Sequence, residues 1–278
     1  MAVVTKTDIK NALTELGIQK GDVMVVHSSL KSFGHVEGGA DAVIDACLET
    51  LTPSGTLVFP TLIQKDFAYA YDTWHMDKPS DVGYITEVFR KREGVLRSDQ
   101  ATHSVAAAGR LADFLTREHG AYGKRIGSFG DTPFAVSSPW QKMYELGGKV
   151  LLIGVDMNKN TCKHLVEYKM LNELLARIKD EKLREELAGK LKYHAALKNP
   201  ELNATLLWPY FDTLRLQQIA DERGLIRKAQ CGDAQLLAFD IRTTNDLAEK
   251  LILENPSDWF KPPMSTWLED AIKAAAPV

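Results

Sequence analysis

Cysteine is scarce in this chain, and its three copies at positions 47, 162 and 231 are odd in number and far apart. No pair has zinc-ligand spacing or suggests a disulfide framework, so we expect a reducing compartment, the cytoplasm. No apolar run reaches the length of a membrane span, and the first residues lack the basic and apolar regions of a secretory signal. We therefore expect a cytoplasmic protein that does not engage a membrane.

An excess of charge of one sign is also absent, because 34 Lys and Arg residues stand against 37 Asp and Glu residues. A formal net charge of −3 gives no reason to expect a nucleic-acid partner. A Walker loop, a Gly-x-Gly-x-x-Gly fingerprint and a Gly-x-Ser-x-Gly elbow are missing too. Their absence disfavours the common nucleotide-binding sites and the common serine-hydrolase arrangement. No histidine pair has metal spacing, so we predict no metal.

What the chain does contain is an alternation of apolar runs and amphipathic segments. The runs predict strands at Asp22–Val26, Gly55–Pro60, His103–Ala108, Lys149–Val155 and Ala234–Phe239. Helical spacing covers Thr5–Gly17, Asp41–Leu51, Asp81–Arg92, Leu111–Glu118, Pro139–Leu146, Leu214–Arg223 and Asn245–Leu253. This order predicts one α/β domain over residues 1–278 with three layers: a mostly parallel central sheet and helices on both faces.

One segment departs from this composition. Lys169–Leu197 is highly charged, and its leucines predict a long helix or a helical hairpin, an insertion at about 169–197. A solvated helix on the domain surface is one interpretation of it. A lid or a dimer contact is the other, and the chain is expected to be a monomer or a homodimer.

The loop after the first predicted strand has the features of an anion site. The strand Asp22–Val26 leads into His27–Ala40, which contains glycines at 34, 38 and 39 and is followed by a helix. Free backbone N–H groups and the positive end of the helix dipole point into such a loop. Glycine lets a ligand approach the backbone closely. An ordinary strand-to-helix turn capped by serines is the alternative.

A second segment carries candidate acid–base chemistry. The strand ending at Val155 leads to Thr161, His164 and Glu167, whose spacing places them on one side of the next helix. A histidine oriented by a nearby carboxylate can serve as a general base. Cys162 points to nearly the opposite side, which disfavours a Cys–His nucleophile pair. The alternative is a partly buried histidine whose hydrogen bonding is satisfied by Glu167.

Several ordered segments together resemble the aminoglycoside 3-N-acetyltransferase family of antibiotic N-acetyltransferases. They are His27–Ala40, Gly55–Thr61, Pro79–Arg90, Gly94–Ser98, Ala101–Ala106, Ser138–Trp140 and Gly154–Glu167. The similarity covers residues 5–168 and resumes more weakly near 224–239. Ala101 stands where the family commonly has proline, and the charged stretch after Tyr168 does not look like the family's usual continuation.

The resemblance implies transfer of an acetyl group from acetyl-CoA to an amine, without a metal. It implies that His164 and Glu167 form the catalytic centre, with Thr161 orienting His164 or the substrate. We expect direct transfer rather than a covalent intermediate on Ser28. The residues implied for CoA binding are Ser28, Ser29, Leu30, Lys31, Val36, Gly38, Gly39, Arg97, Ser98, Thr102 and Ser104. His103, beside Ser104, is a further candidate for a CoA contact.

The expected acceptor is an aminoglycoside-type amine, the chemistry of antibiotic resistance. An acidic and aromatic segment containing Asp66, Phe67, Tyr69, Tyr71, Asp72, Trp74, Asp77 and Asp81 suits an aminosugar or a polyamine. It also fits an ordinary polar loop. From this region and the following helix we assign Asp72, Trp74 and Glu87 to substrate binding. The alternatives are acylation of an amino-sugar nucleotide, hydrolysis of a thioester or amide, and a non-catalytic CoA-binding module.

Overall fold

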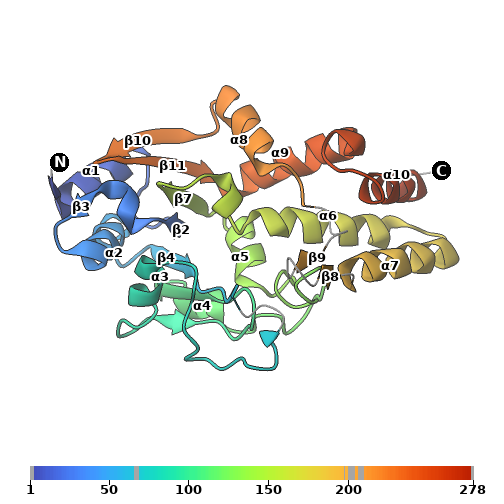
Figure 1. Cartoon of the computed structure of the whole chain (residues 1–278), viewed down its shortest axis with the longest axis horizontal. Helices are drawn as coiled ribbons and strands as arrows, with labels where there is room; N and C mark the ends of the chain where they lie inside the picture. The colour runs from blue at the N-terminus through green and yellow to red at the C-terminus, as the bar shows by residue number, and fades with distance from the viewer. Residues whose placement is uncertain (1–2, 66–68, 197, 200–203, 206–209, 277–278) are drawn as a thin grey trace.

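The fold is built on a seven-stranded sheet in the order β10–β11–β7–β2–β4–β6–β5, and helices α6, α7 and α10 extend to one side of it (Figure 1). The computed structural model describes residues 3–65, 69–196, 198–199, 204–205 and 210–276. The strands of this sheet are β2 (Val23–Ser28), β4 (Thr56–Pro60), β5 (Leu96–Arg97), β6 (Val105–Gly109), β7 (Lys149–Ile153), β10 (Arg227–Cys231) and β11 (Ala234–Asp240). Two small pairs lie outside it: β1 (Val3–Val4) with β3 (His35–Val36), and β8 (Lys198–Asn199) with β9 (Ala204–Thr205).

The sheet is mixed, and the expectation of a mostly parallel sheet is wrong. β2 pairs in parallel with β4 and β7, whereas the other four pairings are antiparallel. β10 and β11 form a hairpin around Gly232, whose φ of 54° suits a tight turn. A connection this short joins only antiparallel strands, since a parallel pair needs a long crossover. The three parallel strands at the centre nevertheless place their carboxyl ends on one edge.

Helices cover both faces of the sheet, as expected. In β2, Met24 and Val26 pack into one core, while Val25 packs into the other. The first core is closed by α1 (Lys6–Glu15), α2 (Gly39–Leu51) and α3 (Tyr84–Phe89). The second is closed by α4 (Ala112–Thr116), α5 (Pro139–Glu145), α6 (Lys163–Arg177), α8 (Thr213–Glu222), α9 (Ile241–Glu254) and α10 (Met264–Ala275). The α/β class with three layers is therefore correct.

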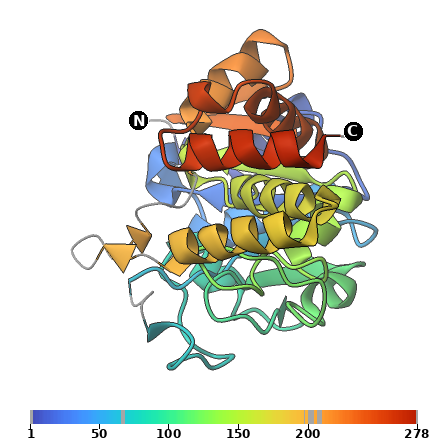
Figure 2. The same ribbon diagram turned by 90° about the vertical axis from the view of Figure 1, so that its right-hand side faces the viewer.

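The described part of the charged stretch, residues 169–196, falls in two helices and the break between them, and residue 197 lies outside the described residues. Residue 169 lies inside α6, and α7 (Glu181–Ala196) follows after a three-residue break. α6 is a core helix, since Tyr168 and Leu171 are fully buried. α7 packs against α6 and α10, and Figure 2 shows α7 and α10 on the side of the molecule facing the viewer. The Trp267 indole N–H donates to the Leu187 carbonyl oxygen over 3.0 Å. The division of residues 1–278 into one domain with an insertion stays a prediction.

The prediction omitted α10, β5, β10 and the short strands β1, β3, β8 and β9. It placed the start of α9 at Asn245 rather than Ile241. None of the helices in the described ranges is both long and apolar enough to cross a membrane.

Candidate active site

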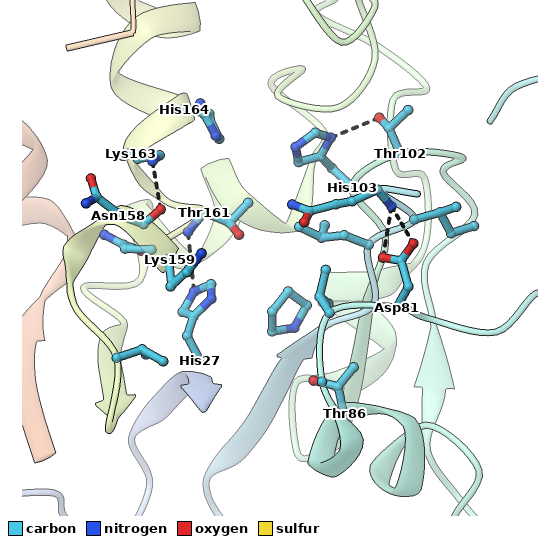
Figure 3. Close-up of a pocket in the computed structure, with 18 of the residues that line it drawn as sticks. His27, Asp81, Thr86, Thr102, His103, Asn158, Lys159, Thr161, Lys163 and His164 are labelled. Atoms are coloured by element: carbon cyan, nitrogen blue, oxygen red, sulfur yellow. Dashed lines mark hydrogen bonds between the residues drawn. The ribbon is translucent and has the colours of Figure 1, made fainter. Parts of the chain in front are cut away.

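A pocket of about 490 Å³ opens at the carboxyl ends of the parallel strands (Figure 3). His27 and Ser28 end β2, Pro60 ends β4, and Val155 follows β7, and all four line the pocket. Ligands of open α/β sheets commonly bind at this edge. The start of α6 supplies another wall, with Thr161, Lys163 and His164 among the lining residues.

The turn between β7 and α6 is held in place by hydrogen bonds to its backbone. Asn160 Oδ1 accepts the Cys162 N–H over 3.0 Å, and His27 Nε2 accepts the Thr161 N–H over 3.4 Å. Burial, followed by the charge of Lys163, lowers the pKa of His27 to about 3. His27 is therefore neutral at physiological pH and acts as an acceptor that anchors this turn. No sequence pattern marks His27 for this role, although it directly precedes Ser28 at the end of a predicted strand.

His164 and Glu167 form a hydrogen-bonded pair at the pocket wall. Nδ1 of His164 lies 2.9 Å from Oε2 of Glu167, and the side chains are 13% and 1% exposed. Burial, with a smaller effect of the Lys163 charge, lowers the pKa of His164 well below its usual value. The imidazole is therefore neutral at physiological pH. Because the Glu167 carboxylate accepts from Nδ1, the lone pair lies on Nε2, which makes no hydrogen bond within the described residues.

Aromatic rings confine His164. Its ring centroid lies 5.1 Å from that of Phe129, 5.8 Å from Phe134 and 5.7 Å from Tyr210. His103 stands 6.0 Å away on a different wall of the pocket, with its ring nearly perpendicular to that of His164. These contacts restrict the orientation of both histidines.

The charged groups of the pocket are few. Lys159 and Lys163 line it, and the Lys163 ammonium donates to the Asn158 carbonyl oxygen over 2.8 Å. Asp81 also lines it, but its carboxylate accepts the N–H groups of Gln64 and Lys65 over 2.7–2.9 Å. Asp81 therefore shapes a loop. No group of three or more metal-ligating side chains occurs within the described part of the chain, and the absence of a metal stays a prediction.

A family model described as aminoglycoside 3-N-acetyltransferase matches residues 25–252. The chain belongs to this family. It is 32% identical over 187 residues to the SPbeta prophage-derived aminoglycoside N(3')-acetyltransferase-like protein YokD of Bacillus subtilis, a match covering 60% of this chain and 65% of that protein. It is 31% identical over 180 residues to aminoglycoside N(3)-acetyltransferase III of Salmonella sp, covering 59% and 60%. The match thus spans less than two thirds of either relative.

Solved structures share the fold of this family member. The crystal structure of YokD from Bacillus subtilis superposes with a TM-score of 0.67 at 23% identity, covering 92% of this chain and 96% of that one. The apoenzyme of aminoglycoside acetyltransferase AAC(3)-IVa gives 0.67 at 22% identity, covering 99% of each chain. AAC-IIIb, solved as a binary complex with CoASH, gives 0.68 at 18% identity, covering 94% and 99%. The family resemblance inferred from the sequence is confirmed.

The residues that the family resemblance implied for the cofactor lie in different surroundings. Ser28 and Thr102 line the pocket. Ser29 precedes η1 (Leu30–Phe33), and its N–H donates to the Ile153 carbonyl oxygen over 3.0 Å. Ser98 and Ser104 are fully buried: Ser98 Oγ lies 2.9 Å from His119 Nδ1, and Ser104 Oγ lies 2.8 Å from Thr61 Oγ1. These two hydroxyls are engaged within the protein.

Arg97 is similarly engaged. Its guanidinium donates to the carbonyl oxygens of Thr61, Met76 and Lys78 over 2.5–2.9 Å and lies 4.7 Å from the Trp74 ring centroid. Burial lowers its pKa to about 10, so it remains charged at neutral pH. Arg97 thus ties the segment before α3 to the end of β4.

The glycine turn at the start of α2 fits a ligand that approaches the backbone. Gly38 and Gly39 have φ values of 78° and 59°, which favour glycine. A Cβ built on Gly39 would meet no atom within 4 Å, so the space beside this helix start is open. Val36 pairs with Val4 in the short β3–β1 ladder, and Lys31 is exposed in η1. None of these four residues is among those lining the pocket.

The three residues predicted for substrate binding do not line the pocket either. Trp74 donates its indole N–H to Asp99 over 2.7 Å. Burial raises the pKa of Glu87, but hydrogen bonds from Arg90 and Lys91 outweigh it and bring the pKa to about 2. Asp72 is exposed. Asp66 and Phe67 lie outside the described residues.

Proposed function

We propose that this protein transfers an acetyl group from acetyl-CoA to an amine of an aminoglycoside-type substrate, with His164 as the general base. The observation that carries the proposal is the His164–Glu167 pair, whose nitrogen and oxygen lie 2.9 Å apart at the wall of a pocket at the carboxyl ends of β2, β4 and β7. Family membership supports the same reaction.

His164 supplies the step that amine acylation requires. An ammonium group has no lone pair, so a proton must leave before the nitrogen can attack a thioester. Nε2 of neutral His164 accepts that proton, and the Glu167 carboxylate stabilises the imidazolium that results. The buried position of Glu167 strengthens this interaction, because water screens it little. General-base assistance of this kind contributes about 10²- to 10⁴-fold to a rate.

Acetyl-CoA provides the activated acyl carbon when it is bound. We infer that Ser28, Ser29, Leu30 and the glycine turn at Gly38–Gly39 hold it, because the glycine turn lies at the positive end of the 13-residue helix α2 and Ser28 lines the pocket. Lys31, Val36, Arg97, Ser98, Thr102 and Ser104 remain predicted members of this surface. Direct transfer needs no covalent intermediate on Ser28, and Thr161 orients His164 or the amine.

An amino-sugar nucleotide is the second candidate acceptor. Lys159 and Lys163 line the pocket, and the Asp81 carboxylate is engaged by backbone N–H groups. This charge distribution favours an acceptor that carries phosphate, whereas exposed Asp72 favours a cationic aminosugar. A cytoplasmic location and a monomeric or homodimeric state remain predictions, as do the substrate-binding roles of Trp74 and Glu87.

The proposal is tested by measuring CoA thiol release from acetyl-CoA with a panel of aminoglycosides, amino-sugar nucleotides and no amine. Release that requires an aminoglycoside, with a product heavier by one acetyl group, supports the proposal. Release without any amine indicates a hydrolase, and no release with bound CoA indicates a binding module. Acylation of nucleotide sugars alone would replace the first acceptor with the second.

A further inference from the structure

His103 presents a second fixed histidine nitrogen to the pocket. Its side chain enters from the end of the loop before β6, on the wall opposite α6 (Figure 3). Nδ1 lies 2.9 Å from Thr102 Oγ1. Nε2 makes no hydrogen bond to any described residue, although His103 is only 4% exposed.

The hydrogen bonds of Gln100 determine which nitrogen of His103 carries the proton. Oε1 of Gln100 accepts the backbone N–H groups of Thr102 and His103, while its Nε2 donates to Tyr71 Oη over 3.0 Å and to Thr132 Oγ1 over 3.3 Å. Two backbone donors on one atom fix the orientation of the amide, since the opposite orientation would set donor against donor.

With the amide fixed, the Thr102 hydroxyl has an acceptor in Gln100. It donates to Gln100 Oε1 over 3.1 Å, so its lone pair accepts from His103. Nδ1 of His103 therefore carries the proton, and Nε2 carries the lone pair that faces the pocket. The ring is held by Phe129 and Phe134, whose centroids lie 4.4 Å and 5.0 Å away.

His164 is in the same tautomer, because Glu167 accepts from its Nδ1. The two rings stand 6.0 Å apart, so both lone pairs are presented to one small volume. An ammonium group has three N–H donors and can satisfy two acceptors at once, whereas a hydroxyl has one. The Nε2 atoms of His103 and His164 can accept hydrogen bonds but cannot donate them. They therefore suit a group with several N–H donors, and the pocket favours an amine over an alcohol.

We propose that His103 is a second acceptor for the reacting amine: one N–H of the ammonium group donates to Nε2 of His164 and another to Nε2 of His103. The inference rests on the proposed function. One proton moves from the amine nitrogen to His164. The nitrogen lone pair then forms the C–N bond as the C–S bond of the thioester breaks, and the proton that the new amide loses neutralises the thiolate. His103 holds its N–H throughout, which orients the lone pair toward the acyl carbon.

Two substitutions separate this role from a structural one. His103→Asn keeps an N–H donor near the Nδ1 position, facing Thr102, and has no acceptor at the Nε2 position. His103→Gln places an amide oxygen near the Nε2 position. With an amine that the wild-type protein acetylates, His103→Asn should lower kcat/KM for the amine about 10- to 100-fold, the effect of one hydrogen bond to a charged group. His103→Gln should recover most of it. The Kd of CoA should be unchanged in both.

Equal kcat/KM for His103→Asn and the wild type would overturn the inference and leave the proposed function intact. Equal losses in both variants, or a matching loss of CoA affinity, would also overturn it. A wild-type protein that acetylates no amine would overturn both proposals. A measurement on the unmodified protein is independent of variant folding: in ¹⁵N-histidine spectra, His103 should show a protonated Nδ1 and an unprotonated Nε2. The reverse tautomer contradicts the inference.

Discussion

Nδ1 of His164 and Oε2 of Glu167 lie 2.9 Å apart on successive turns of α6, and the Glu167 side chain is 1% exposed. The helix itself sets this geometry, because residues three apart share a face. Mobile loops therefore do not determine the orientation of the pair. The imidazole is aimed into the pocket by the same element that carries its partner.

Replacing Glu167 by Gln should lower kcat about 10²- to 10⁴-fold, because an amide donor at Nδ1 favours the wrong histidine tautomer. Steady-state turnover at saturating substrates measures this. Glu173→Gln is the matched control, since Glu173 lies on the same helix with its carboxylate paired to Lys169 at the surface. Comparable losses in both variants would mean that α6, not the His164 pair, is being disturbed.

The acid limb of the kcat/KM profile should lie below pH 6.5. His164 must be neutral to accept a proton, and burial with the Lys163 charge lowers its pKa below that value. Activity is therefore retained as the pH falls through 6.5 and is lost at lower pH. Lys163→Met removes a positive charge and should move the limb upward. A limb above 6.5 in the wild type, or no movement in the variant, would contradict the assignment.

Stability should decrease with acidification partly through His27. Its pKa is about 3 in the folded protein against an ordinary 6.5, so below pH 6.5 the unfolded chain binds the proton more readily. The contribution of neutral His27 to the free energy of unfolding is complete above pH 6.5 and is lost progressively as the pH falls toward 3. At pH 5 the loss is about 2 kcal/mol. Urea unfolding at pH 7 and pH 5 measures it. His27→Gln keeps an acceptor for Thr161 without titrating and should show a smaller decrease; an equal decrease contradicts the prediction.

The parallel core of the fold was accessible from the sequence, because buried strands such as Lys149–Val155 are continuous apolar runs followed by helical periodicity. Of the flanking strands, β6 and β11 were predicted but their antiparallel orientation was not, and β5 and β10 were not predicted. The hairpin signal was present as Gly232-Asp233 between two segments, but Arg227–Cys231 begins with two charged residues and contains no large apolar residue, so it does not stand out as a strand. The alternation of strands and helices therefore led to the prediction of a mostly parallel sheet.

At the site, local spacing predicted the His164–Glu167 contact, which lies within one helix. It did not predict Lys163 and His27 as pocket residues, since their juxtaposition depends on how β2 pairs with β7. The family resemblance, not spacing, implied Ser98 for cofactor binding; its hydroxyl lies buried beside His119, and its role stays a prediction. Polar residues in a loop have the same appearance in a sequence whether they face a ligand or each other.

The glycine turn can be tested for CoA binding with two substitutions. Gly39 has a φ of 59°, which asparagine tolerates and valine does not. Gly39→Val should weaken CoA binding in calorimetry through both its bulk and its backbone strain. Gly39→Asn separates them, because it keeps the backbone and still places a side chain in the open space. Unchanged CoA affinity in folded Gly39→Asn and Gly39→Val would place the cofactor elsewhere.

The most direct measurement is the turnover of His164→Ala against its affinity for acetyl-CoA. If His164 is the general base, kcat for an amine that the wild type acetylates should fall about 10²- to 10⁴-fold. Calorimetric binding of the acetyl donor should be largely kept, because Ser28–Leu30 and Gly38–Gly39 are intact. Turnover of the folded variant near the wild-type rate would contradict the account.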